Sequence, residues 1–142
     1  MYEYNILKDE WEDTKTPMKQ NRAGHSCSLI NEKEIIVIGG KYYENEWVHL
    51  KSSEIFNLEQ KLWRSGPELT TGITFAEFVK AKIGSQYLGY LIGGYDGGSA
   101  SSTIYGLTKD LQKFVNIGIV QKKRERHNAF VLPENMSERC GF

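Results

Sequence analysis

A hydrophobic run that ends in two glycines occurs twice in this sequence and most constrains how the chain can fold. The first run is Glu34–Gly40, in which four consecutive aliphatic residues precede the glycine pair. The second is Gly89–Gly94, about fifty residues further along. Such aliphatic residues favour strands, and paired glycines supply the backbone freedom that a tight turn needs. The recurrence predicts an array of similar β units.

Four kinds of landmark keep nearly the same period, and this coincidence is hard to obtain by chance. The four kinds are a tyrosine or phenylalanine, a second aromatic residue that follows it by seven to nine positions, a histidine, and the last glycine of the glycine pair. With their spacings they are Tyr4, Phe56 and Tyr105 (52 and 49 residues), Trp11, Trp63 and Phe114 (52 and 51), His25 and His127 (102), and Gly40 and Gly94 (54). We interpret the chain as a repeat protein.

Each full unit contains four short segments of strand pattern, and no segment of helical period competes with them. The predicted strands are 26–30, 35–40, 53–58 and 62–64 in the first unit, 74–79, 90–94, 103–107 and 113–115 in the second, and 2–7 and 124–132 outside them. A lone twisted sheet of four strands cannot bury both of its faces. Stacking such sheets around an axis gives a propeller, so we predict an all-β, partial β-propeller.

The unit Arg22–Leu69 resembles the kelch repeat. It has Arg-x-Gly-His at Arg22–His25, the glycine pair, an aromatic residue ahead of Trp63, and Gly-Pro after it. The second unit departs from the pattern, because Phe114 replaces the tryptophan and Thr74–Ala76 stands where Gly-His-Ser is expected. The resemblance implies four-stranded antiparallel kelch blades, about two of them complete, with part-blades at both ends.

The resemblance also implies boundaries. We expect the end of an incomplete blade at 1–20, a blade at 21–69, a second and more divergent blade at 70–121, the first strand of a further blade at 122–133, and a C-terminal tail at 134–142. Kelch propellers have more blades than this, so we expect the C-terminal part of a longer protein, with a BTB–kelch protein as one parent, or a truncated gene model. Open blade faces would then favour self-association.

Structural roles follow from the same resemblance. The glycine pairs turn the chain at the end of a strand, and the large aromatic residues fill the gap between neighbouring blades. The residues expected to play these roles are Gly39, Gly40, Gly93, Gly94, Trp11, Trp63 and Phe114.

Composition narrows the classes of partner and the compartment. Basic and acidic residues balance at 18 each, which gives no reason to expect nucleic acid or an anionic membrane as partner. No apolar run approaches the length that spans a bilayer, and the first residues lack a signal-peptide pattern, so we expect a cytoplasmic protein. Cys27 and Cys140 are too few for a disulfide framework, and Cys27 is predicted to be a buried thiol.

Catalytic patterns are weak throughout the sequence. His25 and His127 occupy equivalent repeat positions, which favours a structural role, and no His or Cys spacing is typical of a metal site. The basic run Lys122–His127 could serve nucleic-acid binding or nuclear import, but it aligns with the repeat's own Arg-x-Gly-His segment, and we favour a solvated loop. We predict no enzyme, no catalytic residue, no metal and no cofactor.

The connection 41–52 is the most informative surface. It carries two tyrosines, a tryptophan and a histidine, the kind of aromatic content that is enriched in protein-binding hot spots. Packing of these rings on their own blade is the alternative. In kelch propellers such loops commonly form the partner-binding face. By that resemblance the candidate contacts are Arg22, Tyr42, Tyr43, Trp47, His49, Tyr95, Asp96 and Arg124.

The favoured function is therefore a non-catalytic protein–protein interaction module with a protein partner of unknown identity. By resemblance it would be the substrate-recognition part of a cullin-type ubiquitin ligase adaptor, or alternatively an actin- and cytoskeleton-binding kelch protein. An alternative of another class is a propeller enzyme of the galactose-oxidase type, which would need copper ligands near an axis. A truncated product without function is the remaining alternative.

Overall fold

The computed structural model describes residues 1–81 and 85–132. Over these residues the chain forms twelve strands in four antiparallel sheets and contains no helix, which confirms the predicted all-β class. The predicted tail at 134–142, the last residue of the expected strand segment 122–133 and Cys140 lie outside the described residues.

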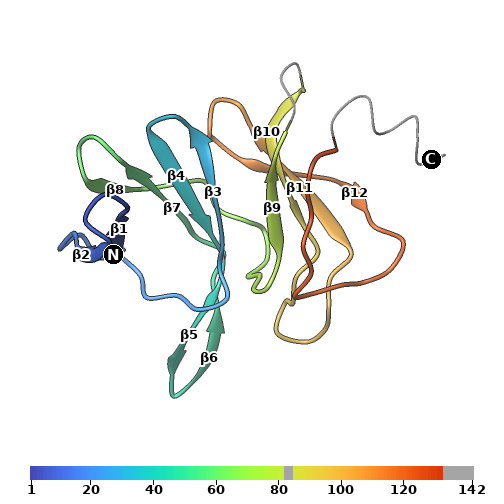
Figure 1. Cartoon of the computed structure of the whole chain (residues 1–142). Helices are drawn as coiled ribbons and strands as arrows, with labels where there is room; N and C mark the ends of the chain where they lie inside the picture. Colours follow the sequence, from blue (N-terminus) through green and yellow to red (C-terminus); the bar gives the residue numbers. More distant parts are fainter. Residues whose placement is uncertain (82–84, 133–142) are drawn as a thin grey trace.

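Two four-stranded sheets make up most of the molecule (Figure 1). The first sheet contains, side by side, β3 (Ser26–Asn31), β4 (Glu34–Ile38), β7 (Ser53–Asn57) and β8 (Leu62–Ser65). The second contains β9 (Glu77–Lys80), β10 (Tyr87–Ile92), β11 (Thr103–Thr108) and β12 (Phe114–Ile119). In both sheets the strands follow one another in chain order, so the two sheets share one topology.

Two smaller hairpins accompany these sheets. The strands β1 (Tyr2–Asn5) and β2 (Glu10–Asp13) pair with each other near the N-terminus. The strands β5 (Lys41–Glu44) and β6 (Glu46–His49) pair between β4 and β7, where the sequence was expected to form a loop. In Figure 1 this second hairpin projects below the first sheet. The expectation failed because the apolar residues of this segment come as adjacent pairs, Tyr42–Tyr43 and Trp47–Val48, and so lack the alternation that marks a strand in a sequence.

The predicted strand at 124–132 is wrong, because the described chain is irregular from 121 to 132. Its beginning is nevertheless tied to the second sheet: the Gly94 N–H donates to the Arg124 carbonyl (2.8 Å) and the Arg126 N–H donates to the Phe75 carbonyl (3.0 Å). A strand needs a partner strand for its remaining backbone groups, and the described residues supply none there.

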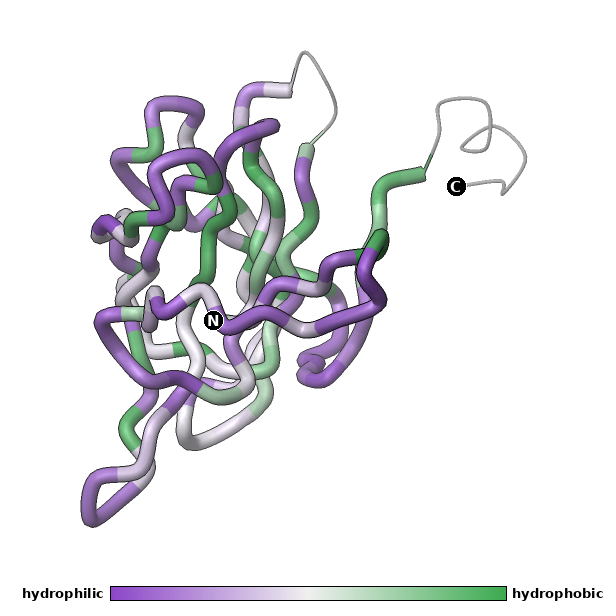
Figure 2. Tube along the Cα trace, turned by 60° about the vertical axis from the view of Figure 1, so that its left-hand side comes forward, coloured by the Kyte–Doolittle hydropathy of each residue, from purple (hydrophilic) through white to green (hydrophobic). Residues whose placement is uncertain are grey.

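The two sheets pack face to face around one apolar core (Figures 1 and 2). The first sheet contributes isoleucines from three of its strands, and the second contributes aromatic and leucine side chains. The main members are Ile30, Ile36, Ile38, Ile55, Phe78, Leu91, Tyr105, Leu107 and Phe114. The strands β3 and β9, the first of each sheet, lie next to each other.

The backbone repeats its geometry with a spacing of 51 residues. Gly24, Phe75 and Arg126 all have positive φ angles, of 62°, 56° and 53°. The Phe75 N–H donates to the Gly24 carbonyl (2.7 Å), as the Arg126 N–H donates to the Phe75 carbonyl. The turns at Lys61 and Leu111, 50 residues apart, also share a positive φ, of 56° and 58°. These bonds define which residues of the two units are equivalent.

This register corrects one landmark of the sequence alignment. Phe56 lies opposite Trp63 in the first sheet, and Leu107 lies opposite Phe114 in the second. Phe56 therefore corresponds to Leu107, and Tyr105 corresponds to Glu54. The alignment of Phe56 with Tyr105 was wrong by two residues, because Tyr105 and Leu107 are both large core residues on the same face of β11.

Both glycine pairs are required by the backbone. Gly39 and Gly93 have φ angles of 63° and 62°, and Gly40 and Gly94 have 91° and 100°. A Cβ at Gly39 would lie 2.2 Å from the Ile73 carbonyl oxygen, and one at Gly93 would lie 2.6 Å from that of Arg124. Each pair thus turns the chain and accepts the close approach of the next unit.

The large aromatic residues divide into two kinds. Trp63 packs against Phe56 with ring centroids 4.9 Å apart and donates its Nε1–H to the Thr16 carbonyl, and Phe114 is buried in the core. Trp11 corrects the expectation, because it is 70% exposed and contacts mainly Tyr4. Cys27, expected to be buried, is also exposed; it lies on the face of the first sheet that is turned away from the second.

Candidate interaction surface

The hairpin β5–β6 presents two large rings to solvent. Tyr43 and Trp47 are cross-strand partners, and their ring centroids lie 5.4 Å apart in an edge-on arrangement. They are 66% and 54% exposed. The turn at Asn45 has a positive φ of 58°, which asparagine tolerates better than most residues. The hairpin therefore holds its rings in a defined position without burying them.

The Tyr43–Trp47 pair is connected to the second unit by cation–π contacts. The Lys41 Nζ lies 4.2 Å from the centroid of Trp47 and 5.3 Å from that of Phe75. The Arg126 Cζ also lies near Phe75, 4.4 Å from the ring centroid. Cation–π contacts of this kind restrain long side chains that would otherwise move freely. We call Tyr43, Trp47, Lys41, Phe75 and Arg126 the cation–aromatic row.

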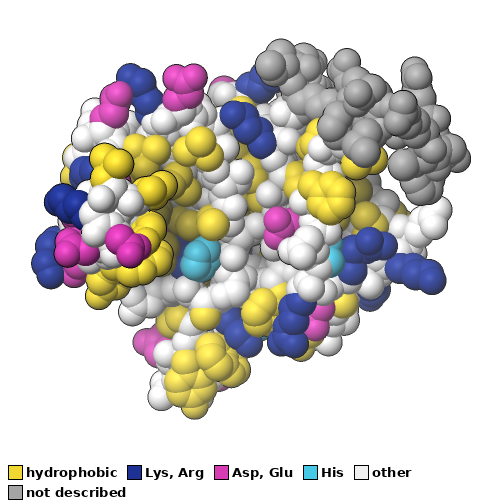
Figure 3. All heavy atoms as spheres, viewed as in Figure 1, with side chains coloured by type: hydrophobic (Ala, Val, Ile, Leu, Met, Phe, Trp, Pro, Cys, Tyr) yellow, Lys and Arg dark blue, Asp and Glu magenta, His cyan; other side chains and the backbone are white. Residues whose placement is uncertain are grey.

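An open depression of about 420 Å³ flanks the row. It is lined by the segment 20–23 together with Lys41, Tyr42, Tyr43 and Trp47. Figure 3 shows apolar side chains of the protruding hairpin beside basic side chains on this lower part of the molecule. Tyr42 is half-buried and donates its hydroxyl hydrogen to Glu44 (3.3 Å). The depression could accept an apolar or aromatic side chain of a partner next to the stacked cations.

The loop after β10 lies beside the base of the hairpin. The rings of His49 and Tyr95 are 5.6 Å apart, and the Tyr95 hydroxyl donates to the Gly97 carbonyl. Asp96 accepts the backbone N–H groups of Gly98 and Ser99, which hold the pKa of its exposed carboxyl below the ordinary value. Burial lowers the pKa of His49. His49 and Tyr95 thus join the two units, and Asp96 remains available to solvent.

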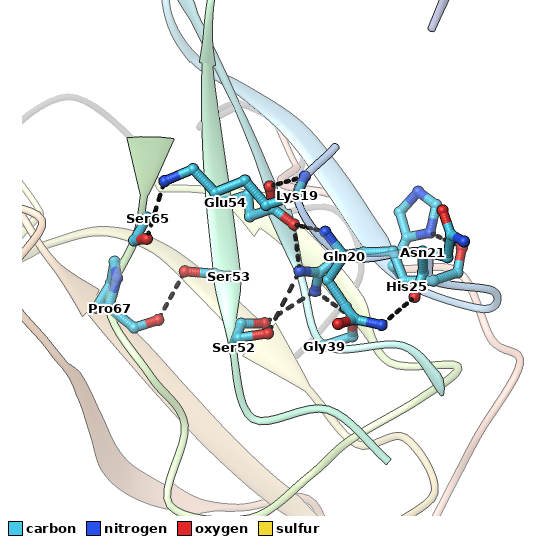
Figure 4. Close-up of polar contacts among 11 residues, drawn as sticks. Lys19, Gln20, Asn21, His25, Gly39, Ser52, Ser53, Glu54, Ser65 and Pro67 are labelled. Atoms are coloured by element: carbon cyan, nitrogen blue, oxygen red, sulfur yellow. Dashed lines mark hydrogen bonds and ion pairs between the residues drawn. The ribbon is translucent and has the colours of Figure 1, made fainter. Parts of the chain in front are cut away.

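Arg22 corrects the sequence expectation, because it is not available to a partner. Its side chain is fully buried and forms an ion pair with Glu54 at 2.7 Å. Its Nη1 donates to the Gly39 and Ser52 carbonyls at 2.7 and 3.0 Å. Figure 4 shows Glu54 also accepting the backbone N–H groups of Lys19 and Gln20, at 2.8 and 3.1 Å.

The hydrogen bonds and the ion pair of Arg22 and Glu54 position the base of the hairpin β5–β6. It fixes the segment 19–22 against the end of β4 and the start of β7, and these are the points from which the hairpin emerges. A buried arginine requires such a set of acceptors, because an unpaired charge in a protein interior is strongly unfavourable.

Arg124 is exposed, as expected, and its Nε donates to the Lys122 carbonyl at 3.2 Å. Lys123 reaches the Ser99 hydroxyl at 3.4 Å, so the basic run lies next to the loop that carries Asp96. The structure thus brings Tyr43, Trp47, His49 and Tyr95 to one side of the molecule, together with cations from the first unit and from the segment 122–132.

Three members of the row were missed from the sequence: Lys41, Phe75 and Arg126. Phe75 occupies the position of Gly24 in the first unit, where a left-handed backbone favours glycine. A bulky ring at such a position was the signal that could have identified it. Lys41 and Arg126 carry no comparable local signal, because their partners come from other parts of the chain.

The described residues contain no group of three or more His, Cys, Asp or Glu side chains arranged to hold a metal ion. Within residues 1–81 and 85–132 there is also no helix that could cross a membrane. No family model matches the chain, and no curated protein matches it.

Proposed function

We propose that this chain is part of a β-propeller of the kelch type and acts as a non-catalytic protein-binding module in the cytoplasm. Two features support the propeller architecture. Consecutive four-stranded sheets share one topology and pack face to face, and their first strands are adjacent, as blades around an axis would require. The left-handed positions Gly24, Phe75 and Arg126, each 51 residues after the one before, support the repeat.

The cation–aromatic row carries the functional proposal. Exposed tryptophan and tyrosine side chains are the residues most enriched in binding hot spots. Here the Lys41 ammonium against Trp47 and the T-shaped contact with Tyr43 hold both rings in place before a partner arrives. Such preorganisation reduces the entropy lost on binding. The row offers flat apolar faces between two cations, which suits a segment with aromatic and acidic side chains.

The test uses the full chain as bait in a cell lysate, followed by quantitative comparison of the captured proteins. Trp47→Ala and Tyr43→Ala should each reduce capture of a specific protein by about tenfold or more, the loss expected for a hot-spot residue. Leu7→Ala is the matched control, because Leu7 is 98% exposed but lies in the N-terminal hairpin. A captured ubiquitin-ligase substrate would favour the adaptor role, and actin the cytoskeletal one.

The proposal is overturned if both hairpin variants capture every protein as well as the wild type does. Far-UV circular dichroism of the variants checks that the sheets remain folded. The rings are exposed, so their removal should leave the spectrum unchanged.

A further inference from the structure

The two four-stranded sheets each have one face inside the molecule and one face turned away from the other sheet. In the first sheet, Ile36, Ile38 and Ile55 point inward. Successive residues of a strand point to opposite faces, so Cys27, Ile35 and Val37 belong to the outer face. In the second sheet Phe78 and Leu91 point inward, and Val79, Tyr90 and Ile92 belong to the outer face.

The internal repeat makes these two outer faces complementary. Cys27 and Val37 are equivalent to Phe78 and Leu91, so the outer face of the first sheet corresponds to the inner face of the second. Conversely, Tyr90 and Ile92 are equivalent to Ile36 and Ile38, so the outer face of the second sheet corresponds to the inner face of the first. The outer face of the second sheet should therefore be able to pack on the outer face of the first sheet of another molecule, as the two inner faces pack on each other within one molecule.

The outer face of the first sheet contains an apolar groove of about 280 Å³. Its lining is formed by Met1, Met18, His25, Cys27, Ile35, Val37 and Trp63. Met1 and Met18, which lie before and after the N-terminal hairpin, form part of the lining; among the other lining residues Cys27 is exposed and Val37 is buried. In the second sheet, the equivalent positions on β9 and β10 are covered by the first sheet. The groove is thus the place where another unit of the same kind would pack.

The segment 124–132 supplies the corresponding element at the opposite side of the molecule. Arg124 approaches Gly93 and Gly94 as Ile73 approaches Gly39 and Gly40, so the segment follows the second sheet as β9 follows the first. In Figure 1 it runs, in red, along the second sheet.

Phe130 is the most exposed large apolar side chain of this segment; Val131 and Leu132 are also exposed, but less so. By the spacing of 51 residues it corresponds to Ser28 of β3 and Val79 of β9. Ser28 lies on the inner face of the first sheet, on the strand that is adjacent to β9. In the first unit, the equivalent residue Ser28 therefore faces the neighbouring sheet. In the segment 124–132, the Phe130 side chain is 78% exposed to solvent.

We propose that two copies of this chain associate head to tail, with Phe130 of one copy inserted into the groove over Cys27, Ile35 and Val37 of the other. The two contacting surfaces are different, so the interface is heterologous. Such contacts close into a ring if the rotation between copies permits and otherwise extend into a chain. The contact rests on the repeat architecture of the proposed function but does not include the cation–aromatic row, so loss of self-association and loss of partner binding can be distinguished.

Disulfide trapping tests this contact directly. In a Cys140→Ser background, Phe130→Cys places a thiol opposite the native Cys27 of the next copy. Mild oxidation should then produce covalently linked dimers and larger species. The matched control is Ile119→Cys in the same background, because Ile119 is 72% exposed but lies at the outer edge of the second sheet. It should link much less, and Cys140→Ser alone should remain unlinked.

Analytical ultracentrifugation over a range of concentrations provides the second measurement. The wild type should show a mass that increases with concentration, and Phe130→Asp should weaken association by about tenfold or more, because a carboxylate would enter an apolar groove. Trp47→Ala should associate like the wild type. A wild-type monomer at every concentration, or equal linking by the Phe130→Cys and Ile119→Cys variants, would overturn the proposal.

Discussion

The two units fill one equivalent buried position with different side chains, an ion pair in the first unit and uncharged residues in the second. In the first unit the buried Arg22 is paired with Glu54, and the backbone N–H of Lys19 donates to that carboxylate. At the equivalent positions of the second unit are Ile73, Tyr105 and Thr70. Ile73 and Tyr105 are buried, and the Tyr105 hydroxyl is hydrogen-bonded to Thr70 at 2.9 Å.

The difference shows that this position does not require an ion pair. In the second unit Ile73 and Tyr105 are buried without any charge, and the hydroxyls of Tyr105 and Thr70 are hydrogen-bonded to each other. Buried ion pairs are seldom more stabilising than well-packed apolar residues, because both charges must lose their hydration. Loss of one member is much worse, since the other charge stays buried without its partner. The first unit is therefore the more vulnerable of the two.

The largest expected effect comes from breaking the pair. Arg22→Ile should lower the free energy of unfolding by about 3–5 kcal/mol, because the Glu54 carboxylate would remain buried without its guanidinium. Urea unfolding followed by circular dichroism measures the change. Arg124→Ile is the control: Arg124 is the third equivalent residue and is exposed, so its loss should cost less than about 0.5 kcal/mol.

Transplanting the second unit's chemistry into the first should restore most of that loss. The triple variant Lys19→Thr, Arg22→Ile, Glu54→Tyr reproduces Thr70, Ile73 and Tyr105 and leaves no charge unpaired. We expect it to unfold within about 2 kcal/mol of the wild type, a difference that reflects imperfect packing. If the triple variant were no more stable than Arg22→Ile alone, the two units would not be equivalent at this position.

The glycine pairs should have a smaller effect. Gly39→Ala places a Cβ against the Ile73 carbonyl in a left-handed conformation, and we expect a loss of more than about 1 kcal/mol. Gly98→Ala is the control, since the nearest atom to its Cβ is Asp96 Oδ1 at 3.6 Å. Thermal unfolding of the two variants should separate them clearly. Similar midpoints would mean that the turn tolerates a side chain.

The histidines should give the smallest effect. Burial lowers the pKa of His25 and of His127, while the equivalent residue of the second unit is Ala76. The unfolded chain then binds the proton more tightly than the native state. Stability is fully present above the ordinary histidine pKa of about 6.5 and falls as the pH decreases through it.

The double variant His25→Ala, His127→Ala copies the second unit and should therefore lose less stability between about pH 7.5 and pH 5.5 than the wild type does. Urea unfolding at the two pH values measures this difference. A pH dependence identical to that of the wild type would show that these two side chains do not contribute to it.

The regular parts of the first unit were predictable from its sequence, because its strands are short runs of strand-favouring residues that end at recognisable turns. The segments 26–30 and 53–58 differ from β3 and β7 by a single residue at one end. The strand predicted at 124–132 failed for a tertiary reason, since strand propensity cannot supply the partner strand that the pattern needs.

The candidate surface was only partly predictable. The aromatic residues of 41–52 were found because they are unusual in a polar segment, but their arrangement as a hairpin was missed. The burial of Arg22 could not be inferred locally, because its carboxylate partner is 32 residues away. The same holds for Lys41 and Arg126, which meet Phe75 only after the two units have packed together.

Site-specific photo-cross-linking is the most direct test of binding through the cation–aromatic row. A photoreactive amino acid in place of Trp47 should give discrete, heavier adducts in a cell lysate, identifiable by mass spectrometry. The same residue in place of Leu7, which is more exposed but lies in the N-terminal hairpin, should give none of these adducts. Identical adducts from both positions, or none from Trp47, would contradict the proposed function.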